Sequence, residues 1–185
     1  PIEAESREDT YLLEPRLHGL SVKVRGGRSL EVKVYRGGAG ILDVAYRARG
    51  RMESWQKWSF PGGPLDQYGG NQYGGDPAGW QPVRKRRRIS RFSLASGQIL
   101  ARAPGPDQEP RCDVELTEVT TRGQDWWTLG FEASGPADLL RGVLEATAVF
   151  VFTIPLPGGE AGAEESRSYA QWLSHLPGTA NDGPG

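Results

Sequence analysis

The sequence predicts an α+β fold, mainly antiparallel β: a tunnel-like β-barrel with a charged interior and helices packed outside. In residues 21–35, SVKVRGGRSLEVKVY, apolar and charged residues alternate on both sides of Gly26-Gly27. Successive side chains of a strand point to opposite faces, so each run is apolar on one face and charged on the other. Later segments repeat this alternation with basic residues in some and acidic residues in others. Curling the charged faces inward would give a tunnel suited to a polyanion.

The strands are predicted in chain order from alternation and from turn residues. Gly26-Gly27 supplies positive φ angles and predicts a hairpin. Residues 61–82 contain two copies of Gln-Tyr-Gly-Gly and several prolines, which predict a long, mobile surface loop. The expected strands are residues 6–13, 21–25, 29–35, 41–47, 52–60, 83–94, 98–103, 112–119 and 126–133.

Two helices are expected after the strands. Pro136 suits a first helical turn with Ser134 as its cap, and apolar residues at 139, 140, 143 and 144 share one face. Residues 148–154 fit either a buried strand or an extension of this helix. Ser166 is the expected cap of a final helix with apolar residues at 169, 172, 173 and 176. Residues 1–177 then form one domain, and residues 178–185 a disordered tail.

Composition excludes several functional classes. The formal net charge of −1, with 22 basic and 23 acidic residues, gives no support for nucleic acid as a partner. The single cysteine, Cys112, excludes an intrachain disulfide and a thiolate metal site. No stretch has transmembrane length, and the first residues lack the pattern of a signal peptide, so we expect a cytoplasmic protein without membrane partners. His18 and His175 lie too far apart in sequence to suggest a shared catalytic role.

The charged strand faces combine two chemistries. Arginine binds phosphate oxygens in bidentate fashion, and lysine offers a point charge. Glutamates on facing strands suit Mg²⁺ or Mn²⁺, because hard cations take oxygen ligands and bridge phosphate oxygens. The run from Arg84 to Arg88 places charge on both faces of its strand, and a solvated edge strand explains it equally well.

A series of short motifs adds to this pattern. In chain order they are Arg7-Glu8-Asp9-Thr10-Tyr11-Leu12, Val22-Lys23-Val24-Arg25, Leu30-Glu31-Val32-Lys33, Arg88, Val114-Glu115-Leu116-Thr117-Glu118-Val119 and Trp127-Thr128-Leu129-Gly130-Phe131-Glu132. Their order resembles the CYTH, or triphosphate tunnel metalloenzyme, group, which includes thiamine triphosphatases, inorganic triphosphatases and class IV adenylate cyclases. The resemblance implies an antiparallel barrel that binds a triphosphate on inward bases and a divalent metal on inward glutamates.

Carried onto this sequence, the resemblance implies metal-dependent binding and hydrolysis of a triphosphate-containing substrate or inorganic polyphosphate. The implied phosphate-binding residues are Lys23, Arg25, Lys33, Lys57 and Arg88. The implied catalytic residues are Glu31, Glu115 and Glu132. The implied ligands of Mg²⁺ or Mn²⁺ are Glu115 and Glu132, with Glu3 and Glu5 as further ligands.

One departure from the family pattern leaves two interpretations open. The family has Glu-x-Glu-x-Lys in its first strand, and Glu3-Ala4-Glu5-Ser6-Arg7 fits with arginine in place of lysine. Arg7-Glu8-Asp9-Thr10-Tyr11 fits the family's second strand better, which would put the metal-binding strand upstream of Pro1. The alternative function is therefore a non-catalytic CYTH-like module that binds polyphosphate, a nucleotide or a protein partner. Internal Lys–Glu pairs would favour the module, and two adjacent carboxylates would favour the enzyme.

Overall fold

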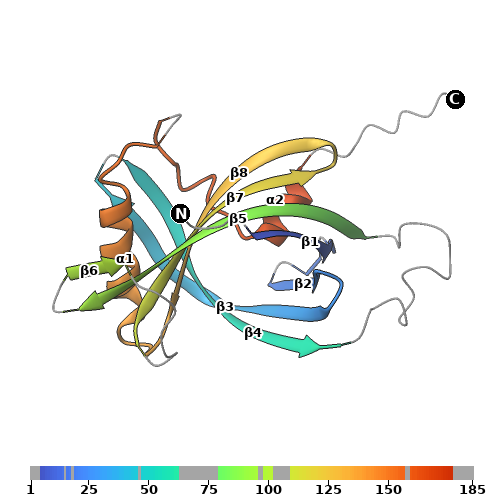
Figure 1. Ribbon diagram of the computed structural model, residues 1–185, viewed down its shortest axis with the longest axis horizontal. Helices are drawn as coiled ribbons and strands as arrows, with labels where there is room; N and C mark the ends of the chain where they lie inside the picture. Colours follow the sequence, from blue (N-terminus) through green and yellow to red (C-terminus); the bar gives the residue numbers. More distant parts are fainter. Residues whose placement is uncertain are drawn as a thin grey trace, which may run out of the picture.

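The computed structural model describes residues 5–14, 16–17, 19–45, 47–62, 79–95, 98–101, 109–156 and 159–176 (Figure 1). Its strands are β1 Glu5–Leu12, β2 Leu20–Arg25, β3 Ser29–Val44, β4 Ala48–Pro61, β5 Trp80–Ala95, β6 Gln98–Ala101, β7 Arg111–Thr121 and β8 Gln124–Ser134. Its helices are α1 Leu140–Val151 and α2 Tyr169–His175.

All strands belong to one antiparallel sheet with the order β4-β3-β2-β1-β5-β7-β8, and β6 pairs with β5. The predicted α+β class and its antiparallel character are confirmed. The predicted closed barrel is not found, because no strand pairing within the described residues joins β4 to β8. The sheet is strongly curved instead, with β3 and β4 on one side and β5, β7 and β8 on the other (Figure 1).

The β2–β3 hairpin forms as predicted, and Gly26 and Gly27 have φ angles of 54° and 67°. The strands expected at 29–35 and 41–47 are one continuous strand, β3. Its register with β4 shifts between Tyr35 and Gly37 and again between Gly38 and Gly40. The glycines lie at these irregular pairings, where they bend the strand without ending it.

The region predicted as a long loop is shorter at both ends. Strand β4 continues to Pro61 and β5 begins at Trp80, because Leu12 on β1 pairs with Trp80 and extends the ladder. Residues 63–78, the predicted tail at 178–185, Glu3 and His18 lie outside the described residues.

Helix α1 covers one part of the sheet. It continues through residue 151, which decides between the two alternatives for residues 148–154 in favour of helix. The predicted cap at Ser134 does not form, because the helix begins one turn later, after Leu139. Ala148 and Phe152 pack on Val44, Ala48, Leu129 and Phe131 to form a hydrophobic cluster.

Helix α2 forms in the predicted stretch of sequence but packs on a side of the sheet that was not predicted. Its cap is Ser168, whose hydroxyl accepts a hydrogen bond from the Gln171 backbone, and Ser166 instead accepts one from the Arg51 backbone. Leu173 and Leu176 pack against Tyr11, Val83 and Val119, which share the face of the sheet that carries the charged residues. The prediction that both helices pack outside is therefore wrong for α2. The charged face ends in apolar side chains, and α2 buries them away from water.

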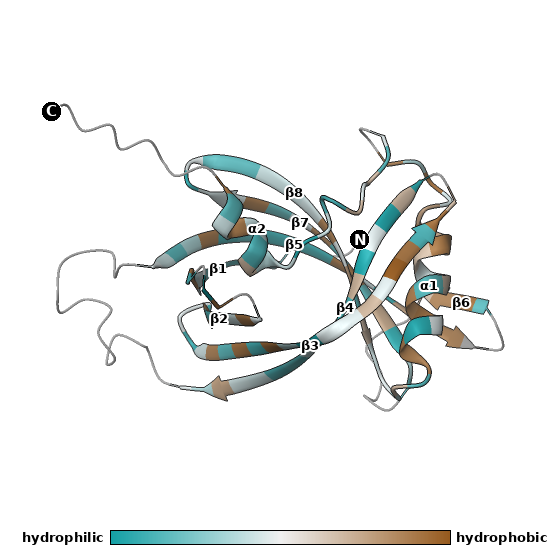
Figure 2. Cartoon of the chain, turned by 180° about the vertical axis from the view of Figure 1, so that it is seen from behind, coloured by the Kyte–Doolittle hydropathy of each residue, from teal (hydrophilic) through white to brown (hydrophobic). Residues whose placement is uncertain are grey.

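The alternation itself is visible along β3, where hydrophilic and hydrophobic bands follow one another (Figure 2). On the outer side of β2 and β3 lie Val22, Val24, Leu30 and Val32, which helices packed outside the sheet would cover. They are only partly buried, whereas Leu129 and Phe131 of β8 do pack with α1 as predicted.

Candidate functional site

The strand register places the charged side chains on one face of the sheet. Residues directly opposite each other in an antiparallel ladder project to the same side. Arg25 pairs with Asp9, Lys23 with Glu31, and Lys33 with Lys57. Following the pairs across the sheet defines the inner face, which carries Glu5, Arg7, Asp9, Lys23, Arg25, Glu31, Lys33, Lys57, Lys85, Arg87, Glu115 and Glu132.

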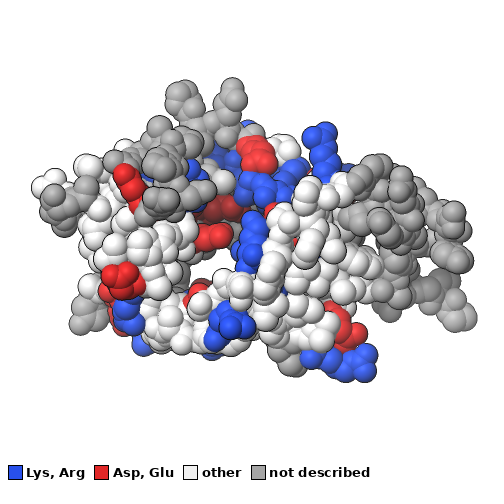
Figure 3. All heavy atoms as spheres, turned by 90° about the horizontal axis from the view of Figure 1, so that it is seen from below, with Lys and Arg blue, Asp and Glu red and all other residues white. Residues whose placement is uncertain are grey.

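The inner face is concave. The ammonium nitrogen of Lys33 on β3 lies 3.9 Å from a carboxylate oxygen of Glu132 on β8, although β2, β1, β5 and β7 separate these strands in the sheet. Figure 3 shows basic and acidic side chains gathered around a hollow in the middle of one side of the molecule. The shared concave face predicted for Lys23, Arg25, Glu31, Lys33, Glu115 and Glu132 is thus confirmed.

Three bases contact one buried carboxylate on this face, and a fourth base lies beside them. Glu31, which is 3% exposed, lies 3.0 Å from Lys23, 3.0 Å from Arg25 and 3.5 Å from Lys57. Lys33 stands directly opposite Lys57. Burial acts to raise the pKa of Glu31, but the neighbouring cations outweigh it and lower the pKa to about 2. We call Lys23, Arg25, Lys33 and Lys57 the cation cluster.

Three members of the cation cluster remain open to solvent. The side chains of Arg25, Lys33 and Lys57 are 37%, 34% and 41% exposed. The other carboxylates beside the cluster are Asp9, 3.1 Å from Lys23, and Glu132, whose side chain is 72% exposed. The positive charges are therefore only partly balanced by nearby carboxylates, and an incoming anion can reach them.

A second, more deeply buried group lies beside the cluster. Asp9 is fully buried and contacts Arg7 at 3.0 Å, Lys23 at 3.1 Å and Lys85 at 3.8 Å. Lys85 also donates a hydrogen bond of 2.7 Å to the Tyr11 hydroxyl. Burial, helped by the charge of Lys23, lowers the pKa of Lys85 to about 7. The amine therefore loses its proton readily near neutral pH.

Arg87 organises the acidic side of the inner face. Its guanidinium pairs with Glu5 and, at 3.0 Å, with Glu115, which also accepts a 2.8 Å hydrogen bond from Thr117. Arg88, predicted to bind phosphate, projects to the outer face of the sheet. It pairs with Leu116 in the ladder and lies 3.9 Å from Glu118. The structure therefore brings Arg87 into the site and leaves Arg88 outside it.

Sequence reasoning missed Arg7, Asp9, Lys85 and Arg87. The run from Arg84 to Arg88 is basic at every position, so its pattern does not reveal which parity faces inward. Pairing with β1 decides it, because Arg7 stands opposite Lys85, and Glu5 opposite Arg87. Alternation within β1, where Glu5, Arg7, Asp9 and Tyr11 share one parity, was the signal that could have found these residues.

The predicted metal ligands that the structure describes, Glu5, Glu115 and Glu132, are each paired with a base. Hard divalent cations take several oxygen ligands at once. Glu115 and Glu5 both pair with Arg87, and Glu132 pairs with Lys33. Within the part of the chain that the structure describes, no three His, Cys, Asp or Glu side chains are arranged to hold a metal ion. The described residues therefore do not fit Mg²⁺ or Mn²⁺.

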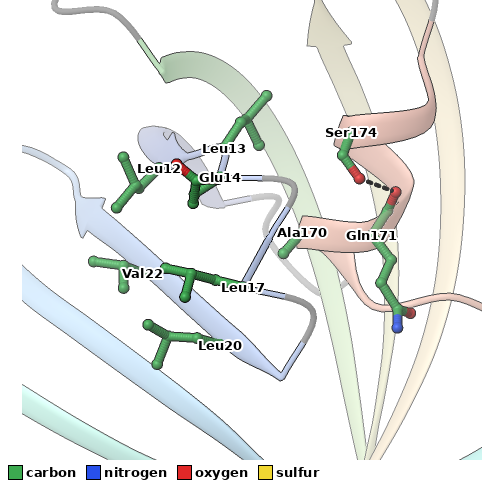
Figure 4. Close-up of a pocket in the computed structure, with 9 residues that line it drawn as sticks. All are labelled: Leu12, Leu13, Glu14, Leu17, Leu20, Val22, Ala170, Gln171 and Ser174. Atoms are coloured by element: carbon green, nitrogen blue, oxygen red, sulfur yellow. Dashed lines mark hydrogen bonds between the residues drawn. The ribbon is translucent and has the colours of Figure 1, made fainter.

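Helix α2 closes one end of the inner face. Tyr169 stacks on Tyr11 with ring centroids 5.9 Å apart, and Trp172 meets Trp126 edge to face at 5.8 Å. A cavity of about 30 Å³ lies between α2 and the end of β1, and four leucines are among the residues that line it (Figure 4). It has room for about one or two water molecules, which is too little for a triphosphate.

A shallow hollow of about 370 Å³ on the outer face includes Arg84 and Arg86. These arginines already have acidic neighbours: Arg84 lies 3.2 Å from Glu8, and Arg86 lies 3.5 Å from Glu118. The inner face, where Arg25, Lys33 and Lys57 are partly exposed, is therefore the stronger candidate for an anion site.

Comparisons with protein families, with curated proteins and with solved structures find no match to this chain. None of the helices within the described ranges is long and apolar enough to span a bilayer.

Proposed function

We propose that the protein binds a polyanion of the triphosphate or polyphosphate type at the cation cluster. The observation that carries the proposal is the gathering of Lys23, Arg25 and Lys57 from three adjacent strands around the buried carboxylate of Glu31, with Lys33 directly opposite Lys57. A chain of phosphates meets several of these cations at once. A single phosphate meets fewer, so affinity should rise with the number of phosphates.

The proposal includes the finer sequence expectations. In it, the curved sheet surrounds the ligand as a CYTH-type tunnel would, and the protein works in the reducing environment of the cytoplasm. Internal pairs such as Lys23–Glu31 and Arg87–Glu115 support the non-catalytic module over the metal-dependent enzyme, because they occupy the carboxylates that would hold a metal.

Hydrolysis is the second candidate, and Lys85 is the observation that favours it. Burial lowers the pKa of this amine to about 7, so it could accept a proton, but its side chain is 3% exposed and lies against the Tyr169 ring, so hydrolysis would require water to enter beside α2. The hydrogen bond to Tyr11 holds the amine in place, and Asp9 links Lys85 to Lys23 of the cation cluster. The leaving group would be the shortened phosphate chain.

The test is titration of the protein with tripolyphosphate, pyrophosphate and phosphate, in EDTA and in Mg²⁺ or Mn²⁺, with released phosphate measured in parallel. Binding that strengthens with phosphate number supports the proposal. Release of phosphate that is lost in Lys85→Met while binding persists would support the hydrolase. No binding of tripolyphosphate at millimolar concentration by the folded protein would overturn both.

A further inference from the structure

Strand β4 forms one edge of the sheet, and most of that edge is open. β4 stands at the end of the strand order and, among the strands that the structure describes, pairs only with β3 (Figure 1). At its beginning the edge is covered, because Ala48 bridges Ala161 and the backbone N–H of Arg51 donates to the Ser166 hydroxyl. Every residue from Gln56 to Pro61 is exposed. The open part of the edge therefore follows Arg51.

The backbone groups that face the open edge follow from the contacts at its beginning. The N–H groups of Arg49 and Arg51 donate to Ala161 and Ser166, on the side of β4 that lies away from β3. Alternate residues of an antiparallel strand direct their N–H and C=O groups to the same edge. The irregular pairings add residues to β3 and none to β4, so this alternation is unbroken along β4. The residues that present backbone groups at the open edge are therefore Glu53, Trp55, Lys57 and Ser59.

Two of these residues carry opposite charges and lie four positions apart on the inner face. Lys57 and Trp55 stand opposite inner-face residues of β3, and Glu53 shares their parity. The Glu53 carboxylate accepts a 2.9 Å hydrogen bond from the Trp55 indole and has no basic partner among the described residues. Lys57 is 41% exposed and lies 3.5 Å from Glu31. Both charges can therefore reach a chain placed beside the edge.

We propose that this edge pairs with the same edge of a second copy of the chain, antiparallel and about a two-fold axis that passes through Trp55. In this register, Glu53 stands opposite Lys57 of the second copy, and Lys57 stands opposite Glu53 of the second copy. Opposite charges that face each other across an antiparallel pair stabilise it. All three central pairs are of the hydrogen-bonded kind, because each residue presents its backbone groups at the open edge. The inference does not depend on the anion proposed for the cation cluster.

The other registers near this one are less favourable. An axis through Lys57 would place the two lysines opposite each other, and an axis through Ser54 would place Lys57 opposite Arg51 of the second copy. Like charges in direct opposition destabilise a strand pair. An axis through Gln56 pairs neither charge with an opposite one. Only the Trp55 register neutralises both charges, and this self-complementarity favours a second copy over an unrelated peptide.

Lysine and proline on an edge strand ordinarily prevent pairing with other chains. In the Trp55 register Lys57 instead meets a carboxylate. Pro61, which has no N–H to donate, lies beyond the paired segment, because the covered beginning of β4 limits pairing to residues 51–59. The two residues that would protect the edge are thus compatible with pairing in this register.

Sedimentation equilibrium of the full chain, from about 1 µM to about 1 mM, tests whether the edge pairs. We expect a reversible dimer with a dissociation constant on the order of 10–100 µM, because an edge contact of this length buries less surface than a permanent dimer. Higher salt should weaken the dimer, since it screens the two ion pairs. A monomer over the whole range would leave the edge to a strand of another protein and would overturn the inference.

Charge reversal tests the register. Glu53→Lys brings two lysines into opposition, and Lys57→Glu brings two carboxylates into opposition, so each variant alone should dimerise about tenfold more weakly. In an equal mixture, one copy of each variant restores both opposite-charge pairs, and the mixture should dimerise as the unmodified protein does. If the mixture dimerises no better than the separate variants, or if the separate variants keep the full affinity, the inference is overturned.

Trp55→Cys tests the same geometry without changing the charges. The Cα atoms of a hydrogen-bonded antiparallel pair lie about 5.5 Å apart, a separation that a disulfide spans. Under mild oxidation Trp55→Cys should form a covalent dimer. Trp58→Cys is the matched control, because Trp58 is 40% exposed on the same strand but would lie about 20 Å from its counterpart. Cys112 is fully buried and is present in both variants. Equal cross-linking of the two variants, or none in Trp55→Cys, would contradict the pairing.

Discussion

The ammonium nitrogen of Lys85 lies 3.5 Å from the centroid of the Tyr169 ring. Lys85 belongs to β5 and Tyr169 to α2, so this contact joins the inner face of the sheet to the helix that closes its end. The Tyr169 hydroxyl is also hydrogen-bonded to Thr128 of β8 at 2.7 Å. Tyr169 also stacks on Tyr11 of β1, so this one side chain joins α2 to three strands.

Replacing Tyr169 should destabilise the protein. Tyr169→Ala removes the stack on Tyr11 and the hydrogen bond to Thr128. We expect a loss of about 2–4 kcal/mol, which lowers the melting temperature by roughly 5–10 °C in a domain of this size. Trp127→Ala is the control, because Trp127 is 61% exposed and projects to the other face. Equal melting temperatures for Tyr169→Ala and the unmodified protein would show that α2 does not need this contact.

Lys85 should make stability depend on pH. Its pKa is lowered to about 7 in the folded chain and is about 10.4 when unfolded, so the unfolded chain binds more protons between these values. The free energy of unfolding is therefore highest above a pH of about 10.4, where the amine is neutral in both states, and it decreases as the pH falls toward 7. The slope is at most about 1.4 kcal/mol per pH unit.

Denaturant unfolding at pH 7.0, 7.5 and 8.0 checks this slope, at pH values below the pKa of about 8.5 of the unfolded Cys112 thiol. Lys85→Met should show a flatter dependence than the unmodified protein, because methionine fills the space without titrating. Parallel curves for the two proteins would mean that Lys85 keeps an ordinary pKa.

The proposed anion site predicts different results for Arg25, on the inner face, and Arg88, on the outer face. Arg25→Ala should weaken tripolyphosphate binding by about 1.5–3 kcal/mol, because it removes a charge-assisted hydrogen bond. Arg88→Ala should leave affinity unchanged, because Arg88 projects from the opposite side of the sheet. Titration calorimetry at 50 and 300 mM salt measures both variants, and affinity should fall as salt screens the cluster. An equal loss in both variants would place the anion elsewhere.

The sequence pattern predicted which residues share a face but not which segments meet. Alternation was enough to group Lys23, Arg25, Glu31 and Lys33, because strand parity is a local property. It could not separate Arg87 from Arg88, where every position is basic and only pairing with β1 decides. Long-range register is set by the whole sheet and leaves no local pattern.

The packing of α2 is a second contact between distant segments that the sequence pattern did not predict. The apolar spacing of Tyr169, Trp172, Leu173 and Leu176 predicted a helix with one buried side. The residues it buries against, Tyr11, Val83 and Val119, come from three strands far apart in sequence. The continuous β3 was missed because Gly37 and Gly40 resemble a turn in sequence, whereas the structure uses them in irregular pairings.

Glu31 supplies the last prediction, because its carboxylate would compete with a bound phosphate for Lys23, Arg25 and Lys57. Glu31→Gln keeps the size of the side chain and removes its charge, which leaves Lys23, Arg25 and Lys57 without their shared counter-ion. Stability without ligand should fall by about 3 kcal/mol, as for other broken buried ion pairs. Tripolyphosphate should bind about tenfold more tightly, because it no longer competes with an internal carboxylate.

Two measurements test this competition. Thermal shift should show a larger rise in melting temperature on adding tripolyphosphate to Glu31→Gln than to the unmodified protein, since binding to the folded state stabilises it. Stability against pH gives the second. The carboxylate contributes above its unfolded pKa of about 4.3 and loses that contribution as pH falls to about 2, so the two proteins should converge in stability there. Weaker tripolyphosphate binding by Glu31→Gln would instead mean that Glu31 positions the cations for the ligand and does not compete with it.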